Sequence, residues 1–188
     1  AGGLYEISRR REAGLRSTFF SSLAGGKRNA VELAKLGAVL AVIGLLWERL
    51  STLLFEWLAP SVAPDLVDLL AVAQYSVEMR DMLFIWLLCG GLLAMLVFFI
   101  AVVSVPLLLD RQDIGFVAAM QTSLRAVSLN LPIILLWALL IVLLTTLGFV
   151  TLFFGLVLLM PWIGHASWHA YRDLVTWDHL PDVAADYR

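Results

Sequence analysis

The feature that most restricts the fold of this chain is a run of 34 residues, Leu131–Gly164, without a charged side chain. A second run, Met82–Leu109, is free of charge over 28 residues. A helix that crosses the hydrocarbon core of a bilayer needs roughly 20 apolar residues, so each run is long enough to span it. Charged residues make up 15% of the chain, against about 25% in soluble domains. The sequence therefore predicts an all-α, polytopic helical membrane protein.

Charges, glycines and prolines divide the chain into four predicted spans. The longer uncharged run suits two helices, and we place the turn between them near Thr145–Gly148. Pro106 is expected to kink or end the second span. The predicted segments are a basic segment at 1–30, spans at 31–58, 82–109, 131–147 and 149–175, a loop at 59–81 and a tail at 176–188.

Residues 112–129 have the pattern of an amphipathic helix. Apolar side chains recur there at steps of three and four, whereas Gln121, Arg125 and Ser128 lie away from them. Such a helix is too polar to span and apolar enough to lie in the membrane interface. The sequence predicts an interfacial helix whose apolar positions are Ile114, Val117, Met120, Leu124 and Val127.

The first predicted span carries charges towards its end. Its uncharged part, Leu36–Trp47, has only 12 residues, and Glu48, Arg49 and Glu56 follow it. Ionisable residues inside a span are costly and often functional, so a proton or ion path is one hypothesis. In the other, which the short uncharged part favours, these residues lie near the outer interface with Arg49 snorkelling to the headgroups. Both one tilted span and a short span continued by an amphipathic turn fit the pattern.

The distribution of Lys and Arg predicts the orientation. Residues 1–35, residues 110–130 and the part after residue 164 together contain eleven, whereas the loop at 59–81 contains one. Segments rich in Lys and Arg remain in the cytoplasm. Four spans place all the basic segments on that side. Both ends of the chain are therefore expected in the cytoplasm.

Three stretches resemble an uncharacterised bacterial family of predicted integral membrane proteins, a domain of unknown function. They are GLYEISRRREAG (3–14), VVSVPLLLDRQDIGFVAAMQTSLRAVSLN (102–130) and GHASWHAYRDLV (164–175). In that family two further hydrophobic helices precede the first stretch, so the resemblance implies that this chain is the C-terminal part of a six-span protein. Some members carry the label cytochrome c oxidase subunit I. That subunit needs histidines on several helices, whereas all three histidines here follow residue 164.

His165 and His169 form a candidate metal or haem site. Residues four apart share a helix face, and Asp173 could supply a third metal ligand. One haem held by two histidines needs them on opposite sides of the iron, which two neighbours on one helix cannot provide. The alternative is the water-facing end of a span, with Trp162 and Tyr171 in an aromatic belt. We favour this alternative and expect neither a metal nor another cofactor.

The remaining features favour a structural role. No phosphate loop, nucleophile–base set or zinc-protease motif is present, so we do not expect an enzyme. Asp110, Arg111 and Arg125 are expected to form a cytoplasmic ionic cluster that ties the interfacial helix to the second span. Small residues allow helices to approach closely. The candidate helix-contact residues are Gly90, Gly91, Ala94, Gly148 and Gly155.

Together with the family resemblance, these features predict a non-catalytic accessory or scaffold subunit of a protein complex in the bacterial cytoplasmic (inner) membrane. Its expected partners are the lipid bilayer and another integral membrane protein, with no nucleic acid. A small carrier or channel that uses Glu48, Arg49 and Glu56 is the alternative function. Haem or metal binding at His165 and His169 is the third.

The predicted orientation can be measured with single cysteines. In a Cys89→Ser background, a cysteine at Ser61 should react with an impermeant thiol reagent added outside the cell. A cysteine at Ser128 should not, because the basic segments are expected inside. Labelling of position 128 without labelling of position 61 would refute the orientation.

Overall fold

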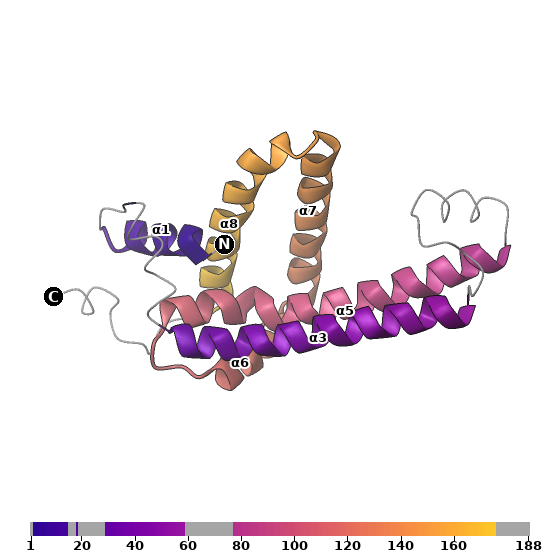
Figure 1. The fold of residues 1–188 in the computed structure, drawn as a ribbon. Coiled ribbons are helices and arrows are strands. Elements are labelled where there is room, and N and C mark those ends of the chain that lie inside the picture. Colours follow the sequence, from indigo (N-terminus) through magenta and orange to yellow (C-terminus); the bar gives the residue numbers. More distant parts are fainter. Residues whose placement is uncertain (1, 15–17, 19–28, 59–76, 176–188) are drawn as a thin grey trace. The chain divides into compact units, whose positions relative to one another are not determined.

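The computed structural model describes residues 2–14, 18, 29–58 and 77–175 of the chain (Figure 1). Over these residues the protein is helical and has no strand, which confirms the all-α prediction. The helices are α1 (Gly2–Glu12), α3 (Ala30–Leu58), α5 (Val77–Asp110), α6 (Phe116–Leu129), α7 (Leu131–Val150) and α8 (Phe154–Leu174). Most of the predicted loop at 59–81 and the whole tail at 176–188 lie outside the described residues.

The chain folds as two compact units, and the smaller one comprises residues 37–97. In this unit the later part of α3 and the first part of α5 lie side by side (Figure 1). The Trp47 ring covers Gly90 so closely that a Cβ atom there would be 2.8 Å from the ring. Trp86 lies 5.7 Å from Trp47 between ring centroids, and its Nε1 donates a hydrogen bond of 2.6 Å to Ser51. Aromatic packing and one small residue therefore hold the two helices together.

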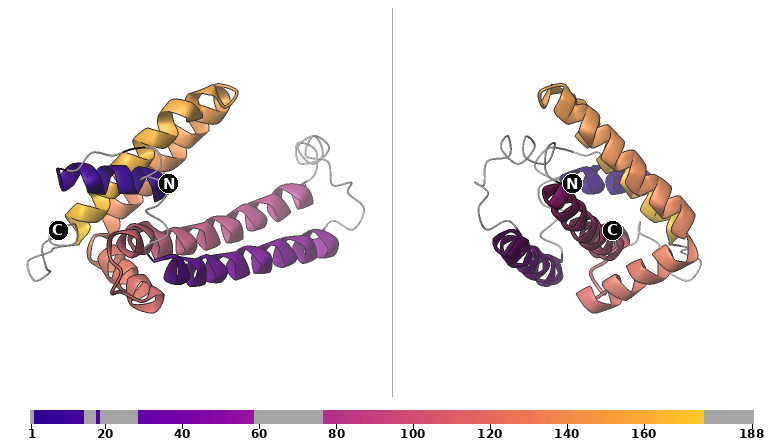
Figure 2. Two further views of the ribbon diagram at one scale, coloured as in Figure 1. Left: turned by 60° about the vertical axis from the view of Figure 1, so that its left-hand side comes forward. Right: turned by 90° about the vertical axis from the view of Figure 1, so that its right-hand side faces the viewer.

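The larger unit comprises residues 1–36 and 98–188. Its described part contains α1, the first turns of α3, the last turns of α5, and the helices α6, α7 and α8. The helices α7 and α8 form an antiparallel hairpin, and α1 packs across α8 (Figure 2). The largest side chains with less than 2% exposure in this unit include Val103, Leu107, Leu108, Ile134, Trp168 and Tyr171. The core thus lies where the end of α5 meets the last turns of α8.

Three described helices are long and apolar enough to cross a membrane. They are α3 over Ala30–Trp57, α5 over Arg80–Asp110 and α7 over Leu131–Val150. The sequence predicted a fourth span at 149–175, but α8 is not among the helices that qualify. Its apolar part, 154–164, has only 11 residues before the polar stretch that begins at His165. The four-span count is therefore not confirmed, whereas a polytopic architecture is consistent with three such helices.

The helix predicted at 112–129 is present as α6, although it begins only at Phe116. Its buried face is made of small residues, and Ser123 lies at the centre of that face. The Ser123 hydroxyl donates to the Phe99 carbonyl at 2.6 Å and accepts from the Val103 N–H at 3.2 Å. Two of the apolar positions named from the sequence, Val117 and Leu124, lie outside this buried face and are 51% and 42% exposed. They leave α6 with an outward apolar surface of the kind that an interfacial helix needs.

The prediction of a turn near Thr145–Gly148 is wrong, because α7 continues to Val150 and the turn occupies residues 151–153. Gly148 serves close packing instead: a Cβ atom there would be only 2.2 Å from the Leu156 side chain. Pro106 also does not end its helix, since α5 continues through it to Asp110. Gly and Pro are tolerated inside transmembrane helices more often than inside soluble ones, which agrees with both positions.

The packing of Trp47 on Gly90 gives a test with a neighbouring control. Replacement of Gly90 by Leu should lower the free energy of unfolding by about 1–3 kcal/mol, because the new side chain must displace the Trp47 ring. Replacement of Gly91 by Leu should be neutral or slightly stabilising, since nothing lies within 4 Å of a Cβ there. Thermal unfolding in detergent measures both. Equal losses for the two variants would contradict the packing.

Candidate functional site

Polar side chains from three separate parts of the chain meet in the larger unit. They come from α1, from the end of α5 at Asp110, and from the last three turns of α8. These parts belong to the three stretches quoted from the sequence, at 3–14, 102–130 and 164–175. We call this group of side chains the helix-end cluster: Glu6, Ser8, Arg9, Arg10, Glu12, Asp110, His165, Trp168, His169, Tyr171 and Arg172.

Within α1, Glu6 is the centre of a buried ion pair. Arg9 donates to both carboxylate oxygens of Glu6, each at 2.9 Å, and Arg10 donates to one of them at 2.9 Å. Glu6 and Arg9 are only 4% and 2% exposed. The spacing of three and four residues places these groups on one helix face, and the two-pronged geometry suits an arginine and a carboxylate. Two arginines of α1, Arg9 and Arg10, thus form ion pairs within the protein.

The charge on Glu6 survives its burial because of these partners. Burial acts to raise the pKa of Glu6, but the hydrogen bonds and positive charges of Arg9 and Arg10 outweigh it. The net effect lowers the pKa below its ordinary value of 4.5. A carboxylate that accepts bonds from cations is stabilised in its charged form. Glu6 is therefore ionised at neutral pH, and its ion pairs stabilise the helix α1.

Glu12, at the end of α1, connects α1 to α8. Its carboxylate accepts a hydrogen bond of 2.9 Å from the Trp168 indole nitrogen. The same carboxylate lies 3.3 Å from Nε of Arg172 and 3.8 Å from Nδ1 of His169. Tyr5 adds a ring contact, 6.1 Å between centroids, with Trp168. One carboxylate thus contacts three side chains on two successive turns of α8.

Asp110 connects the end of α5 to the same turns of α8. Its Oδ2 accepts a hydrogen bond of 3.0 Å from the Tyr171 hydroxyl and lies 3.6 Å from Nη1 of Arg172. Asp110 is only 6% exposed. Because Arg172 also contacts Glu12, a single guanidinium links carboxylates from α1 and α5. The result is a continuous network of charged groups across three helices.

The sequence predicted that Asp110 and Arg111 would tie α5 to the interfacial helix. The structure instead pairs Asp110 with α8, while other residues hold the corner between α5 and α6. Asn29 donates to the Arg111 and Ile114 carbonyls, and Glu32 accepts from the Phe116 N–H at the start of α6. A carboxylate at a helix N-terminus satisfies an otherwise unpaired N–H. The partner on α8 was missed because no local pattern relates residues 61 positions apart.

His165 and His169 face α1. Nδ1 of His165 lies 2.7 Å from the Ser8 hydroxyl, and His169 lies near Glu12. Gly164 permits this approach, since a Cβ atom there would be 2.5 Å from the Leu4 side chain. Over the described residues no group of three or more His, Cys, Asp or Glu side chains could hold a metal. The histidines act here as contacts between helices.

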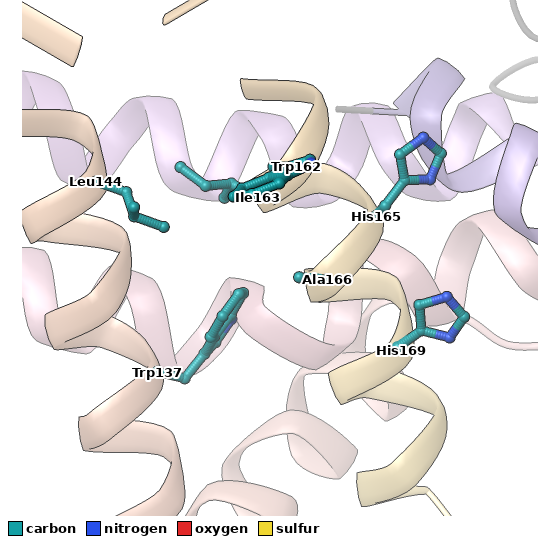
Figure 3. A pocket seen from close by; sticks show the side chains of 7 residues that line it. All are labelled: Trp137, Leu144, Trp162, Ile163, His165, Ala166 and His169. Carbon is teal, nitrogen blue, oxygen red and sulfur yellow. The ribbon is translucent and has the colours of Figure 1, made fainter. Parts of the chain in front are cut away.

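A pocket of about 370 Å³ lies between α7 and α8. Figure 3 shows that its side chains from α7 and α8 are apolar or aromatic, and that the imidazoles of His165 and His169 project from the side of α8 away from Trp137. The pocket therefore offers shape and apolar contact rather than a convergent polar set. Its lining residues are Trp137, Leu144, Trp162, Ile163, His165, Ala166 and His169.

The charged stripe predicted on the first span lies in the smaller unit and is exposed there. The Glu48 and Arg49 side chains are 57% and 79% exposed and lie 3.4 Å apart, and Glu56 is also exposed. Within this unit the contacts to α5 come from another face of α3, at Trp47 and Ser51. Within the smaller unit the stripe is therefore turned away from the α3–α5 contact.

The five predicted helix-contact residues divide into two groups. Gly90 packs against Trp47, and Gly148 and Gly155 pack against each other at the turn of the α7–α8 hairpin. Gly91 and Ala94 remain exposed on α5. Three of the five are thus used for packing within the chain itself.

The helix α1 is a structural element that was not predicted from the sequence. The sequence signal was nevertheless present, because Glu6 precedes Arg9 and Arg10 by three and four residues, a spacing typical of helices. The stretch was interpreted only as a basic segment that sets topology. Its docking on α8 depends on tertiary contacts that sequence periodicity does not encode.

Long apolar helices whose buried charges gather at their ends define an integral membrane protein of the polytopic helical class. The chain belongs to the family described as "Predicted integral membrane protein (DUF2189)", whose profile matches residues 1–110. This match contains α1, α3 and α5, and with them Glu6, Glu12 and Asp110 of the helix-end cluster. No curated protein and no solved structure matches the chain.

The buried Glu6 predicts a loss of stability in acid. Because its pKa is lower in the folded than in the unfolded state, its contribution is present above pH 4.5 and is lost as the pH falls through the folded value. Glu6→Gln should lower the free energy of unfolding by about 2 kcal/mol at neutral pH. The difference from the unmodified protein should shrink steadily below pH 4.5.

Thermal unfolding in detergent at a series of pH values measures this difference. Glu48→Gln is the matched control, since Glu48 is exposed, and it should not change the pH profile. A deficit of Glu6→Gln that stays constant down to strongly acidic pH would contradict the role assigned to the Glu6 charge.

Proposed function

We propose that this protein is a non-catalytic accessory or scaffold subunit of a complex in the bacterial cytoplasmic membrane, and that it binds another integral membrane protein. The observation that carries the proposal is the exposed charged stripe Glu48, Arg49 and Glu56 on α3. Ionisable side chains on a spanning helix are costly unless they meet a partner or water. A stripe turned away from the α3–α5 contact is suited to a partner outside the chain.

The short length of the uncharged part of α3 supports binding to another membrane protein. The uncharged part between Lys35 and Glu48 has 12 residues, or about 18 Å of helix, which is less than the roughly 30 Å of a hydrocarbon core. Arg49 can reach the headgroups along its flexible stem, but the shorter Glu48 has less reach. A neighbouring membrane protein with complementary polar groups would stabilise both Glu48 and Arg49.

A carrier role finds less support. Carriers place polar ligands near the middle of the membrane, commonly on broken helices that face the interior of a bundle. Within the smaller unit the stripe is exposed instead, and in the larger unit the charged groups of the helix-end cluster bind one another. Haem or metal binding at His165 and His169 finds less support still, because His165 already contacts Ser8.

Site-specific photocrosslinking in native membranes tests the proposal. A photoreactive amino acid at Thr52, on the stripe between Glu48 and Glu56, should form an adduct with one integral membrane protein that mass spectrometry identifies. The same probe at Val42, which is 54% exposed on the uncharged part of α3, should not. The double change Glu48→Gln with Glu56→Gln should reduce the Thr52 adduct severalfold, because it removes both carboxylates.

A transport assay separates the two functions. Absence of a protein adduct from Thr52, together with proton or ion flux in reconstituted vesicles that Glu48→Gln abolishes, would replace the scaffold role with the carrier role.

A further inference from the structure

The turn between α7 and α8 satisfies its own backbone. The N–H groups of residues 151–156 all donate within the hairpin: five bond to backbone carbonyls and Gly155 bonds to the Thr151 hydroxyl at 2.9 Å. The bonds from Leu152 to Phe149 and from Phe153 to Gly148 form the paired arrangement that closes a helix C-terminus. A helix normally begins with several unpaired N–H groups, which water then satisfies. At the start of α8 the turn itself replaces that water.

The residues in this turn are unusual for a turn in water. Leu152 and Phe153 adopt φ values of 52° and 70°, a left-handed conformation that favours Gly or Asn over bulky side chains. Both side chains point outward, with 78% and 63% of each residue exposed. Phe154 is 80% exposed, and no charged residue occurs between Leu131 and Gly164. Polar side chains would stabilise a turn that faces water, whereas the exposed side chains of Leu152, Phe153 and Phe154 are apolar.

The helices α7 and α8 also pack closely against each other next to the turn. A Cβ atom at Gly155 would lie 3.2 Å from the Cα atom of Gly148, so the two backbones come together there without intervening side chains. Phe149 and Phe153 contact each other edge to face, 5.3 Å between centroids. Close contact through small residues is how helices associate in lipid, where no hydrophobic force drives them together.

The polar residues of α8 set the depth of the turn. The 11 residues Phe154–Gly164, or about 16 Å of helix, separate the turn from His165, and Arg172 follows about 27 Å from Phe154. His165 contacts Ser8, and Arg172 contacts Glu12, in the helix-end cluster. A group of charged side chains is more stable near a membrane surface than at the membrane centre. With the cluster near one surface, a turn about 16–27 Å away lies inside a core roughly 30 Å thick.

We propose that the α7–α8 hairpin enters the bilayer and returns to the same side, with residues 149–154 embedded in the hydrocarbon and covered by lipid acyl chains. The hairpin then replaces the two complete crossings that the uncharged run suggested. Both ends of the hairpin remain on one side, so the even number of crossings implied by the basic segments is kept. The exposed phenylalanines and leucine are the surface that the acyl chains contact.

Nitroxide labels at single cysteines test this placement in vesicles of phosphatidylcholine and phosphatidylglycerol. In a Cys89→Ser background, a label at Leu152 should collide frequently with oxygen, which concentrates in the hydrocarbon, and rarely with a water-soluble nickel chelate. A label at Phe154, outside the left-handed backbone, gives the same measurement if the first variant folds poorly. A label at Asp113, whose side chain is 73% exposed, is the aqueous control and should show the opposite ratio.

Each outcome is decisive. A ratio of oxygen to nickel collisions at least tenfold higher at position 152 or 154 than at 113 supports an embedded turn. Frequent nickel collisions would place the turn in water and overturn the proposal. Few collisions with either reagent would mean that protein, from a partner or a second copy, covers the turn, which also overturns it.

Discussion

Arg172 holds together parts of the chain that are far apart in sequence. Its guanidinium lies against Glu12 of α1 and Asp110 of α5, while it belongs to α8 itself. An apolar environment makes each of these charges costly alone, so each carboxylate needs a cation or a hydrogen-bond donor, and the guanidinium needs an anion or an acceptor. The relative positions of α1, the end of α5 and the end of α8 follow from this requirement.

The same requirement explains how far the sequence could predict the fold. Residue spacing and the absence of charge depend only on neighbours along the chain, and they were enough to find α3, α5, α6 and the α7–α8 hairpin. They could not place the turn at 151–153, because Gly148 has the composition of a turn but serves close helix packing. They also predicted a full span at 149–175, although only 11 apolar residues of α8 precede the polar stretch at His165.

Only part of the helix-end cluster could be predicted from the sequence. Its members on α8 were recognised as a polar helix end, and Asp110 as part of an ionic cluster, but their partners were not identified. The contacts from Ser8 to His165 and from Glu12 to Trp168 join residues more than 150 positions apart. No periodicity relates such residues, and only the folded chain brings them together.

Docking of α1 also has a consequence for biosynthesis. Ser8 precedes its partner His165 by 157 residues, so α1 leaves the ribosome long before the surface that it covers exists. Contacts of such long range form late in folding. Until then α8 does not cover α1, and the arginine-rich helix is open to the anionic membrane surface. In the finished protein α1 packs against α8 and Arg9 is only 2% exposed, so the nascent chain presents a more basic surface than the folded one.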